Sequence, residues 1–171
     1  RIIPTKGCHI FLKALKNIKF KEKVLIIGDN DQLHEYHNKL VKISHGLDVK
    51  FTGLIKEREV LNNYILNADF FVFPSSYEAM SMMLLEVVSL GVPVICSDIP
   101  ENKTIFDVQE VLFFETNNIY DLADKIKYAL HHKNEMKTRA NLAFNKLNNN
   151  YTWEKIAQQY SLCYKELIES V

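Results

Sequence analysis

Two carboxylates flank the point at which a predicted strand gives way to a predicted helix. Glu78 and Glu86 are eight residues apart, and Ser75 and Ser76 lie in the turn before the helix. Eight helical residues rise about 12 Å, and the two carboxylates then lie within a quarter turn of each other. A helix N-terminus binds phosphate, and carboxylates accept hydrogen bonds from vicinal hydroxyls. This spacing predicts a site for a diphosphate that carries a sugar at each end.

The same residues also have a purely structural interpretation. Glu78 would then only stabilise the helix dipole, and Glu86 would lie on a solvated face, as paired glutamates commonly do. Met80, Met82 and Met83 are expected to pack in the core rather than to form a flexible binding patch. For an isolated pair of glutamates the structural interpretation is the stronger one, so the surrounding sequence decides.

Short apolar runs alternate with segments of helical periodicity along most of the chain. Runs of strand length occupy residues 23–28, 49–52, 69–73, 92–96 and 111–114. Strands that are apolar throughout and separated by helices are typical of a parallel sheet covered on both faces. The sequence therefore predicts a doubly wound α/β fold, with a helix over 80–90 and ligands at the carboxyl ends of the strands.

The remaining sequence predicts a helical C-terminus from residue 119 to residue 171, without a linker, so residues 1–171 are expected to form a single domain. Its 21 basic and 21 acidic residues balance, which disfavours nucleic acid as a partner. The three cysteines lack metal-site spacing and fit a reducing compartment, so no metal site is expected. The apolar runs are too short to cross a bilayer.

Residues 70–101, with the sequence FFVFPSSYEAMSMMLLEVVSLGVPVICSDIPE, strongly resemble the signature of the group-1 (GT4-type) retaining glycosyltransferases. Residues 1–7 resemble the R-x4-K-G phosphate clamp of that family. Residues 25–29 and 51–53 resemble its next two strand ends, and 151–153 resemble the start of its last helix. The resemblance implies the Rossmann-like C-terminal half of a GT-B fold, which binds the nucleotide sugar. The N-terminal acceptor domain would be absent from this chain.

The resemblance also implies roles for charged residues. Arg1 and Lys6 would pair with the donor diphosphate and stabilise the departing nucleotide, a charge-assisted contact. Glu78 would bind the transferred sugar and would complete the catalytic set. Glu86 would bind the nucleoside ribose, and Lys56 would lie at the edge of the base.

Further positions follow from the same resemblance. Backbone amides around Met82 and Met83 would face the phosphates. Ser81 would either donate to a phosphate or simply cap the helix. Ala79 and Ser81 stand where the family usually has glycine, which narrows the site, and Thr104 stands where an acidic residue is common.

The implied reaction transfers a sugar, with retention, from a nucleoside diphosphate sugar to an acceptor hydroxyl. UDP is the expected nucleotide, and neither a metal nor another cofactor is implied, because basic side chains and a helix N-terminus supply the positive charge. A glycan or lipid-linked acceptor would bind through the missing domain during bacterial surface polysaccharide or lipid-linked glycan synthesis. We expect a cytoplasmic protein that can associate peripherally with the inner face of the plasma membrane.

Two alternatives remain open at the level of the sequence. The domain could bind a nucleotide sugar without catalysis, or it could belong to a sugar-nucleotide epimerase of the same architecture. Because all three follow or flank predicted strand ends, we expect Lys6, Glu78 and Glu86 to converge on one cleft at the carboxyl ends of the strands. Arg1 is expected to be poorly fixed because the strand before it would be absent or truncated. The isolated domain is expected to bind the donor without transferring the sugar.

Overall fold

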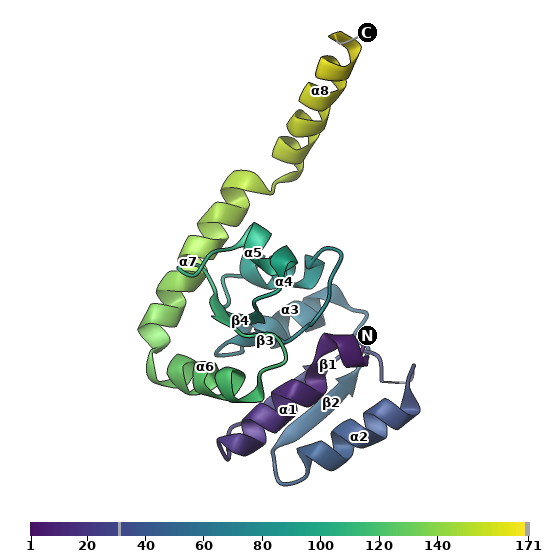
Figure 1. Ribbon diagram of the computed structural model, residues 1–171, viewed down its shortest axis with the longest axis vertical. Helices are drawn as coiled ribbons and strands as arrows, with labels where there is room; N and C mark the ends of the chain where they lie inside the picture. Colours follow the sequence, from purple (N-terminus) through teal and green to yellow (C-terminus); the bar gives the residue numbers. More distant parts are fainter. Residues whose placement is uncertain (31, 170–171) are drawn as a thin grey trace.

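The computed structural model describes residues 1–30 and 32–169, in which strands and helices alternate as the sequence predicts (Figure 1). The strands are β1 (Val24–Ile27), β2 (Val49–Gly53), β3 (Phe71–Phe73), β4 (Val94–Ser97) and β5 (Leu112–Phe114). The helices are α1 (Cys8–Asn17), α2 (His34–Ser44), α3 (Arg58–Leu66), α4 (Met82–Ser89), α5 (Pro100–Ile105), α6 (Ile119–His131), α7 (Lys133–Asn150) and α8 (Trp153–Glu169), preceded by the 3₁₀ turn η1 (Pro4–Lys6).

All strand pairs of the described chain are parallel, but they divide into two sheets. One pairs β1 with β2, and the other has the order β3-β4-β5. The N-terminal segment links the carboxyl ends of the two sheets. The amide of Ile2 donates to the Asp29 carbonyl beyond β1, and the amide of Ser76 beyond β3 donates to the Thr5 carbonyl. The N-terminal segment, with Lys6, therefore lies where ligands bind in such folds.

Both faces of the second sheet are covered, as its uninterrupted apolar strands predict. Along β4, Ile95 belongs to a core shared with α1, α2 and α6. Its neighbours Val94 and Cys96 belong to a second core, shared with α3, α4 and α7. Because successive side chains of a strand point to opposite faces, this division places helices on both sides. Ile26 of β1 belongs to the first core as well, so the two sheets share this core.

Helix α4 begins two residues later than the sequence predicts. The amide of Met82 donates to the carbonyl of Met80, so a tight turn precedes the helix. Met80 and Met82 are 54% and 51% exposed, and the prediction that both pack in the core is wrong. Met83 alone of the three packs against the second core. Met80 and Met82 are thus exposed on either side of Ser81, which is 1% exposed.

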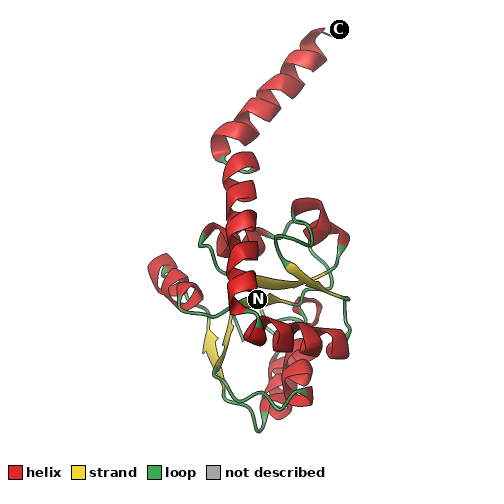
Figure 2. Cartoon of the chain, turned by 90° about the vertical axis from the view of Figure 1, so that its left-hand side faces the viewer, coloured by secondary structure: helices red, strands yellow, loops and turns green. Residues whose placement is uncertain are grey.

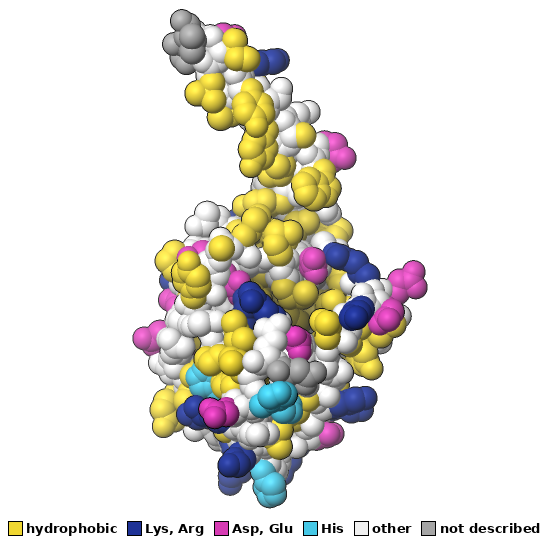
Figure 3. Space-filling model, turned by 90° about the vertical axis from the view of Figure 1, so that its right-hand side faces the viewer, with side chains coloured by type: hydrophobic (Ala, Val, Ile, Leu, Met, Phe, Trp, Pro, Cys, Tyr) yellow, Lys and Arg dark blue, Asp and Glu magenta, His cyan; other side chains and the backbone are white. Residues whose placement is uncertain are grey.

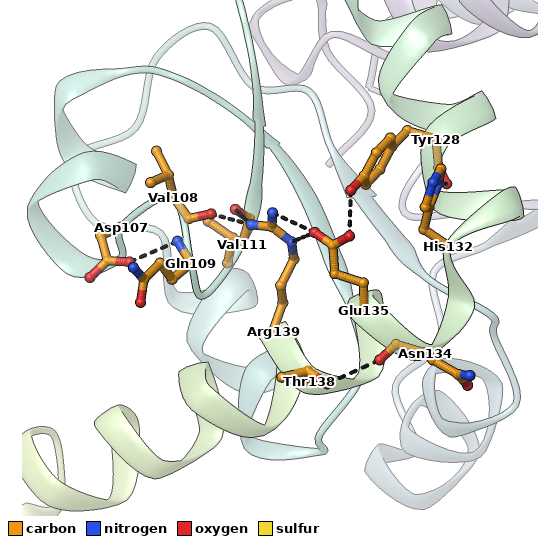
Figure 4. Close-up of polar contacts among 10 residues, drawn as sticks. All are labelled: Asp107, Val108, Gln109, Val111, Tyr128, His132, Asn134, Glu135, Thr138 and Arg139. Carbon is orange, nitrogen blue, oxygen red and sulfur yellow. Dashed lines mark hydrogen bonds and ion pairs between the residues drawn. The ribbon is translucent and has the colours of Figure 1, made fainter.

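Helix α7 is bound to the loop between α5 and β5 by Lys146, which pairs with Glu110 at 2.8 Å, and by Arg139, whose contacts Figure 4 shows. The Arg139 guanidinium donates to the Val108 and Val111 carbonyls and forms an ion pair with Glu135 at 2.8 Å. Glu135 also accepts a hydrogen bond from Tyr128 of α6. These contacts join the end of the sheet domain to the helical C-terminus.

Helix α8 projects away from the rest of the chain beyond a bend after α7 (Figures 1 and 2). None of its described residues is buried, and Trp153 at its start is 85% exposed. None of the helices in the described part of the chain combines the length and apolar character that a membrane crossing requires.

Candidate functional site

Gly7 brings the N-terminal segment against the end of β3. Its φ of +70° lies in the left-handed region, and a Cβ there would be 2.0 Å from the Pro74 carbonyl oxygen. Only glycine fits both constraints without a shift of the backbone. The contact places Lys6, the preceding residue, beside the loop that follows β3. The glycine after the lysine is therefore a requirement of close backbone packing.

Lys6 and Glu78 form an ion pair with 2.5 Å between Nζ and Oε1. The Lys6 side chain is 30% exposed and that of Glu78 only 9%. Removal from water strengthens such a charged hydrogen bond. The structure thus joins two residues predicted for the site that are 72 positions apart.

Glu86, half-buried on α4, forms an ion pair with Arg58 at the start of α3, with 3.0 Å between Nη2 and Oε1. The Arg58 side chain is 72% exposed, so it is held weakly. Sequence reasoning missed Arg58, because nothing in the sequence distinguishes it from other charges of a helical first turn. Lys56 is exposed in the short connection between β2 and α3, close in sequence to Arg58. The structure shows no contact between Glu86 and the Lys6–Glu78 pair, so their shared cleft stays a prediction.

Ser81 lies at the N-cap position of α4, yet within the described chain its hydroxyl does not cap the helix. It donates to Asn102 Oδ1 at 2.6 Å instead, and Ser81 is 1% exposed. Both sequence-based roles, helix cap and phosphate donor, are thus replaced in this structure by a buried contact. The Met82 amide is also engaged, by the Met80 carbonyl, which removes it from the amides expected to face a phosphate.

Four buried polar residues of the described chain form one network, the Asn102 cluster. Asn102 Nδ2 donates to the Ser97 carbonyl at 2.9 Å and lies 3.4 Å from Ser97 Oγ. Ser97 Oγ donates to the Ser75 carbonyl at 2.5 Å, and Ser81 completes the network. All four residues are at most 1% exposed. Sequence analysis missed this cluster, because the hydrogen bonds join residues of four separate segments.

The Arg1 side chain is exposed, although the backbone of Arg1 lies beside Gly28 at the end of β1. Ala79, in place of the usual glycine, is exposed, so its methyl group does not pack in the core. Cys8 follows Gly7, and burial raises the pKa of its thiol to about 11, so it stays protonated near neutral pH.

Figure 3 shows a recess on the right-hand side of the molecule as drawn in Figure 1, the side on which the N-terminus lies. Basic and acidic side chains surround its apolar floor. Two other hollows, of about 410 and 280 Å³, lie elsewhere, along residues 130–135 and among residues 16–21 and 46–47. In residues 1–30 and 32–169, no group of three or more histidine, cysteine, aspartate or glutamate side chains is placed to hold a metal ion. The arrangement offers basic side chains, carboxylates and a helix N-terminus, which suits a phosphorylated sugar.

Known proteins with similar sequences include enzymes that transfer sugars. Residues 1–147 match the sequence model of the family described as glycosyl transferases group 1. The chain is 28% identical over 166 residues to the O-antigen biosynthesis glycosyltransferase WclY of Escherichia coli, a match that covers 97% of this chain and 45% of that relative.

Solved structures resemble the whole described fold. A glycosyltransferase from Rickettsia africae superposes with a TM-score of 0.84 at 20% identity, covering 100% of this chain and 47% of that one. Anabaena HepE in complex with UDP-glucose superposes with a TM-score of 0.83 at 19% identity, with the same coverage. These likenesses confirm the Rossmann-like α/β fold expected for a GT-B glycosyltransferase. The chain spans about half the length of these proteins.

Proposed function

Because this chain belongs to the group 1 glycosyl transferases, we propose that it binds the nucleotide-sugar donor of a retaining enzyme of that family. The observation that carries the proposal is the Lys6–Glu78 ion pair at the carboxyl ends of the strands. It brings together a cation suited to diphosphate and a carboxylate suited to sugar hydroxyls.

The donor would bind at this pair. The Lys6 ammonium leaves Glu78 and pairs with the diphosphate, where negative charge grows as the bond between sugar and phosphate breaks. Glu78, released from Lys6, accepts hydrogen bonds from the hydroxyls of the sugar. Arg1 would add a second cation, and the start of α4 would face the phosphates with its partial positive charge. A metal ion is not needed for this stabilisation, since the basic side chains supply the charge.

The nucleoside would lie on the other side of α4. Glu86 accepts hydrogen bonds from the ribose hydroxyls once Arg58 is displaced, and Lys56 lies at the edge of the base. HepE, whose fold this chain shares, is described in complex with UDP and with UDP-glucose. We therefore propose a UDP-sugar as the donor.

The acceptor follows from the class of relative. WclY is named for O-antigen biosynthesis, which builds a bacterial surface polysaccharide. We propose that the full-length protein transfers the sugar to a glycan or lipid-linked acceptor, at the inner face of the plasma membrane. The acceptor would be held by polypeptide outside residues 1–171.

A thermal-shift screen against UDP-, GDP- and ADP-sugars tests donor binding. A ligand that binds only the native state, at about a hundred times its Kd, stabilises it by about 2.7 kcal/mol. We expect a UDP-sugar to raise the melting temperature most. Failure of all three classes at millimolar concentration would contradict the proposal.

Turnover by the full-length protein, with the anomeric configuration of the product read by NMR, tests the reaction. We expect retention. Binding of the donor without turnover on any glycan or lipid-linked acceptor would favour a non-catalytic binding module. Epimerised nucleotide sugar in the reaction mixture would favour an epimerase.

A further inference from the structure

We propose that Asn102 is a positioning residue that holds the loop carrying Glu78 in its donor-binding geometry. This inference rests on the proposed function of Glu78 as a ligand of the donor sugar. Asn102 itself lies on α5, and its side chain is fully buried, so it does not face the recess. Its effect on the donor therefore passes through the residues that it holds.

The Asn102 cluster grips the loop at both ends. Ser75, at one end, is held through its carbonyl by Ser97 Oγ, and Ser81, at the other, through its hydroxyl by Asn102 Oδ1. Asn102 Nδ2 joins these two contacts through its hydrogen bond to the Ser97 carbonyl. Glu78 lies midway, three residues from Ser75 and three from Ser81. One side chain thus links the two points from which the loop with Glu78 departs.

The loop between these points has little burial of its own. Tyr77 is 68% exposed, Met80 is 54% exposed, and Ala79 is also exposed. Ser76 is bound to the Thr5 carbonyl, which fixes the first part of the loop beside the N-terminal segment. The second part, from Tyr77 to Ser81, is held by the ion pair of Glu78 with Lys6 and by the Ser81 contact. Segments with few buried contacts open locally at low cost, so the grip on Ser81 decides how well Glu78 is oriented.

The chemistry of the cluster calls for a carboxamide. Asn102 accepts a hydrogen bond at Oδ1 and donates at Nδ2 in the same buried space. An aspartate of the same shape could still accept from Ser81 but could not donate to Ser97, and it would bury a charge. An alanine would leave the Ser81 hydroxyl without its acceptor, and unsatisfied buried groups destabilise the local structure.

Cleavage by chymotrypsin after Tyr77 in the full-length protein tests, without any ligand, whether the Asn102 cluster holds the loop. We expect Asn102→Ala to accelerate this cleavage by about tenfold, because losing a buried hydrogen bond makes local opening easier. Ser81→Ala, which removes only one contact, is expected to act in the same direction and guards against a variant that fails to fold. Cleavage after Tyr160, 62% exposed on α8, should keep its wild-type rate.

Ile126→Val is the matched control, since it trims the core on the opposite face of the sheet and lowers stability without touching the cluster. An unchanged rate at Tyr77 in both cluster variants would overturn the proposal. Equal acceleration at Tyr77 and Tyr160, or the same acceleration at Tyr77 in Ile126→Val, would overturn it as well, because the effect would then be global.

Calorimetric titration with UDP and with UDP-glucose tests whether the Asn102 cluster affects binding of the donor. We expect Asn102→Ala to lower the affinity for UDP-glucose by about tenfold and the affinity for UDP by no more than about threefold, since Glu78 would contact only the sugar. Equal weakening of both ligands, or none, would overturn the positioning role. If the wild-type protein binds neither ligand, the proposed function fails instead. The cleavage at Tyr77 alone then decides whether the Asn102 cluster holds the loop.

Discussion

Lys6 and Glu78 show what the site requires of single residues. Their ion pair joins two segments that are 72 positions apart, and its geometry depends on neighbours that carry no charge. Gly7 allows the backbone of the first segment to approach Pro74, and the Asn102 cluster holds the second. The two charged residues could be named from the sequence, because their types and spacing resemble a known motif. The hydrogen bonds that hold them join distant segments, which no local pattern encodes.

Gly7→Ala should damage both stability and donor binding. The left-handed backbone alone disfavours a non-glycine residue by about 1–3 kcal/mol. The new Cβ would also be 2.0 Å from the Pro74 carbonyl oxygen, which must push Lys6 away from Glu78. Urea unfolding and calorimetric titration with a UDP-sugar measure the two effects.

Gly91→Ala is the matched control for Gly7→Ala, because Gly91 has the same φ of +70° and a Cβ there meets no described atom within 4 Å. It should lose stability through backbone strain but keep its donor affinity. If both variants bind the donor equally well, the close approach of Gly7 does not position Lys6.

Glu86→Gln should weaken UDP binding by about 1–3 kcal/mol, the range for the loss of a charged hydrogen bond. Stability should change little, because the partner of Glu86 is Arg58, whose side chain is 72% exposed. Glu135→Gln, which also breaks an ion pair with an arginine, serves as the control in calorimetry. Unchanged UDP affinity in Glu86→Gln would remove Glu86 from the site.

The elements that position the site follow from apolar periodicity and glycine placement. The strands lie where the sequence predicts, to within a few residues, whereas the short α5 between β4 and β5 was not predicted. The start of α4 differs, because the Met80 carbonyl takes the Met82 amide in a turn that hydrophobic pattern does not reveal. Met80 and Met82, on either side of the buried Ser81, are exposed. Boundaries of this kind depend on individual hydrogen bonds, whereas the elements themselves depend on the average pattern.

Asp98 connects two of these elements and should make stability depend on pH. It follows β4 and accepts hydrogen bonds from the amide and hydroxyl of Thr116, beyond β5, and from Lys103. Desolvation raises the pKa of Asp98, but hydrogen bonds from Lys103 and Thr116 outweigh it, and the net pKa lies below its ordinary value of 3.8. The carboxylate therefore stabilises the fold above that value, and this contribution is lost as the pH falls through the lowered pKa.

Asp98→Asn should consequently be less stable than the wild type near pH 7, by about 1–2 kcal/mol, because charged hydrogen bonds are replaced by neutral ones. The difference should shrink as the pH falls below the ordinary aspartate value. Urea unfolding across this range measures it, with Asp124→Asn as the control, since Asp124 is 73% exposed in its pair with Lys127. A difference that does not change with pH would contradict the assigned role of the carboxylate.

For the whole molecule, the parallel α/β architecture was predictable from the sequence and is confirmed by the related structures. Its division into two sheets was not, because hydrophobic runs identify strands but not the gaps between them. The long exposed α8 was predicted only as a helix. No described residue of α8 is buried, and helical periodicity alone does not determine that the helix projects from the body.

The central claim is that the fold brings Lys6 to the place where a nucleoside diphosphate binds. Calorimetric titration of the full-length protein with UDP tests it most directly, with Lys6→Ala compared to Lys133→Ala. Lys133 also forms an ion pair, with Asp69 at 2.8 Å, but on a part of the surface away from residues 1–7. We predict that Lys6→Ala lowers the affinity for UDP by at least about tenfold, as expected for a lost contact between ammonium and phosphate. Lys133→Ala should bind UDP with the affinity of the wild type. Equal UDP affinity in all three proteins would contradict the account.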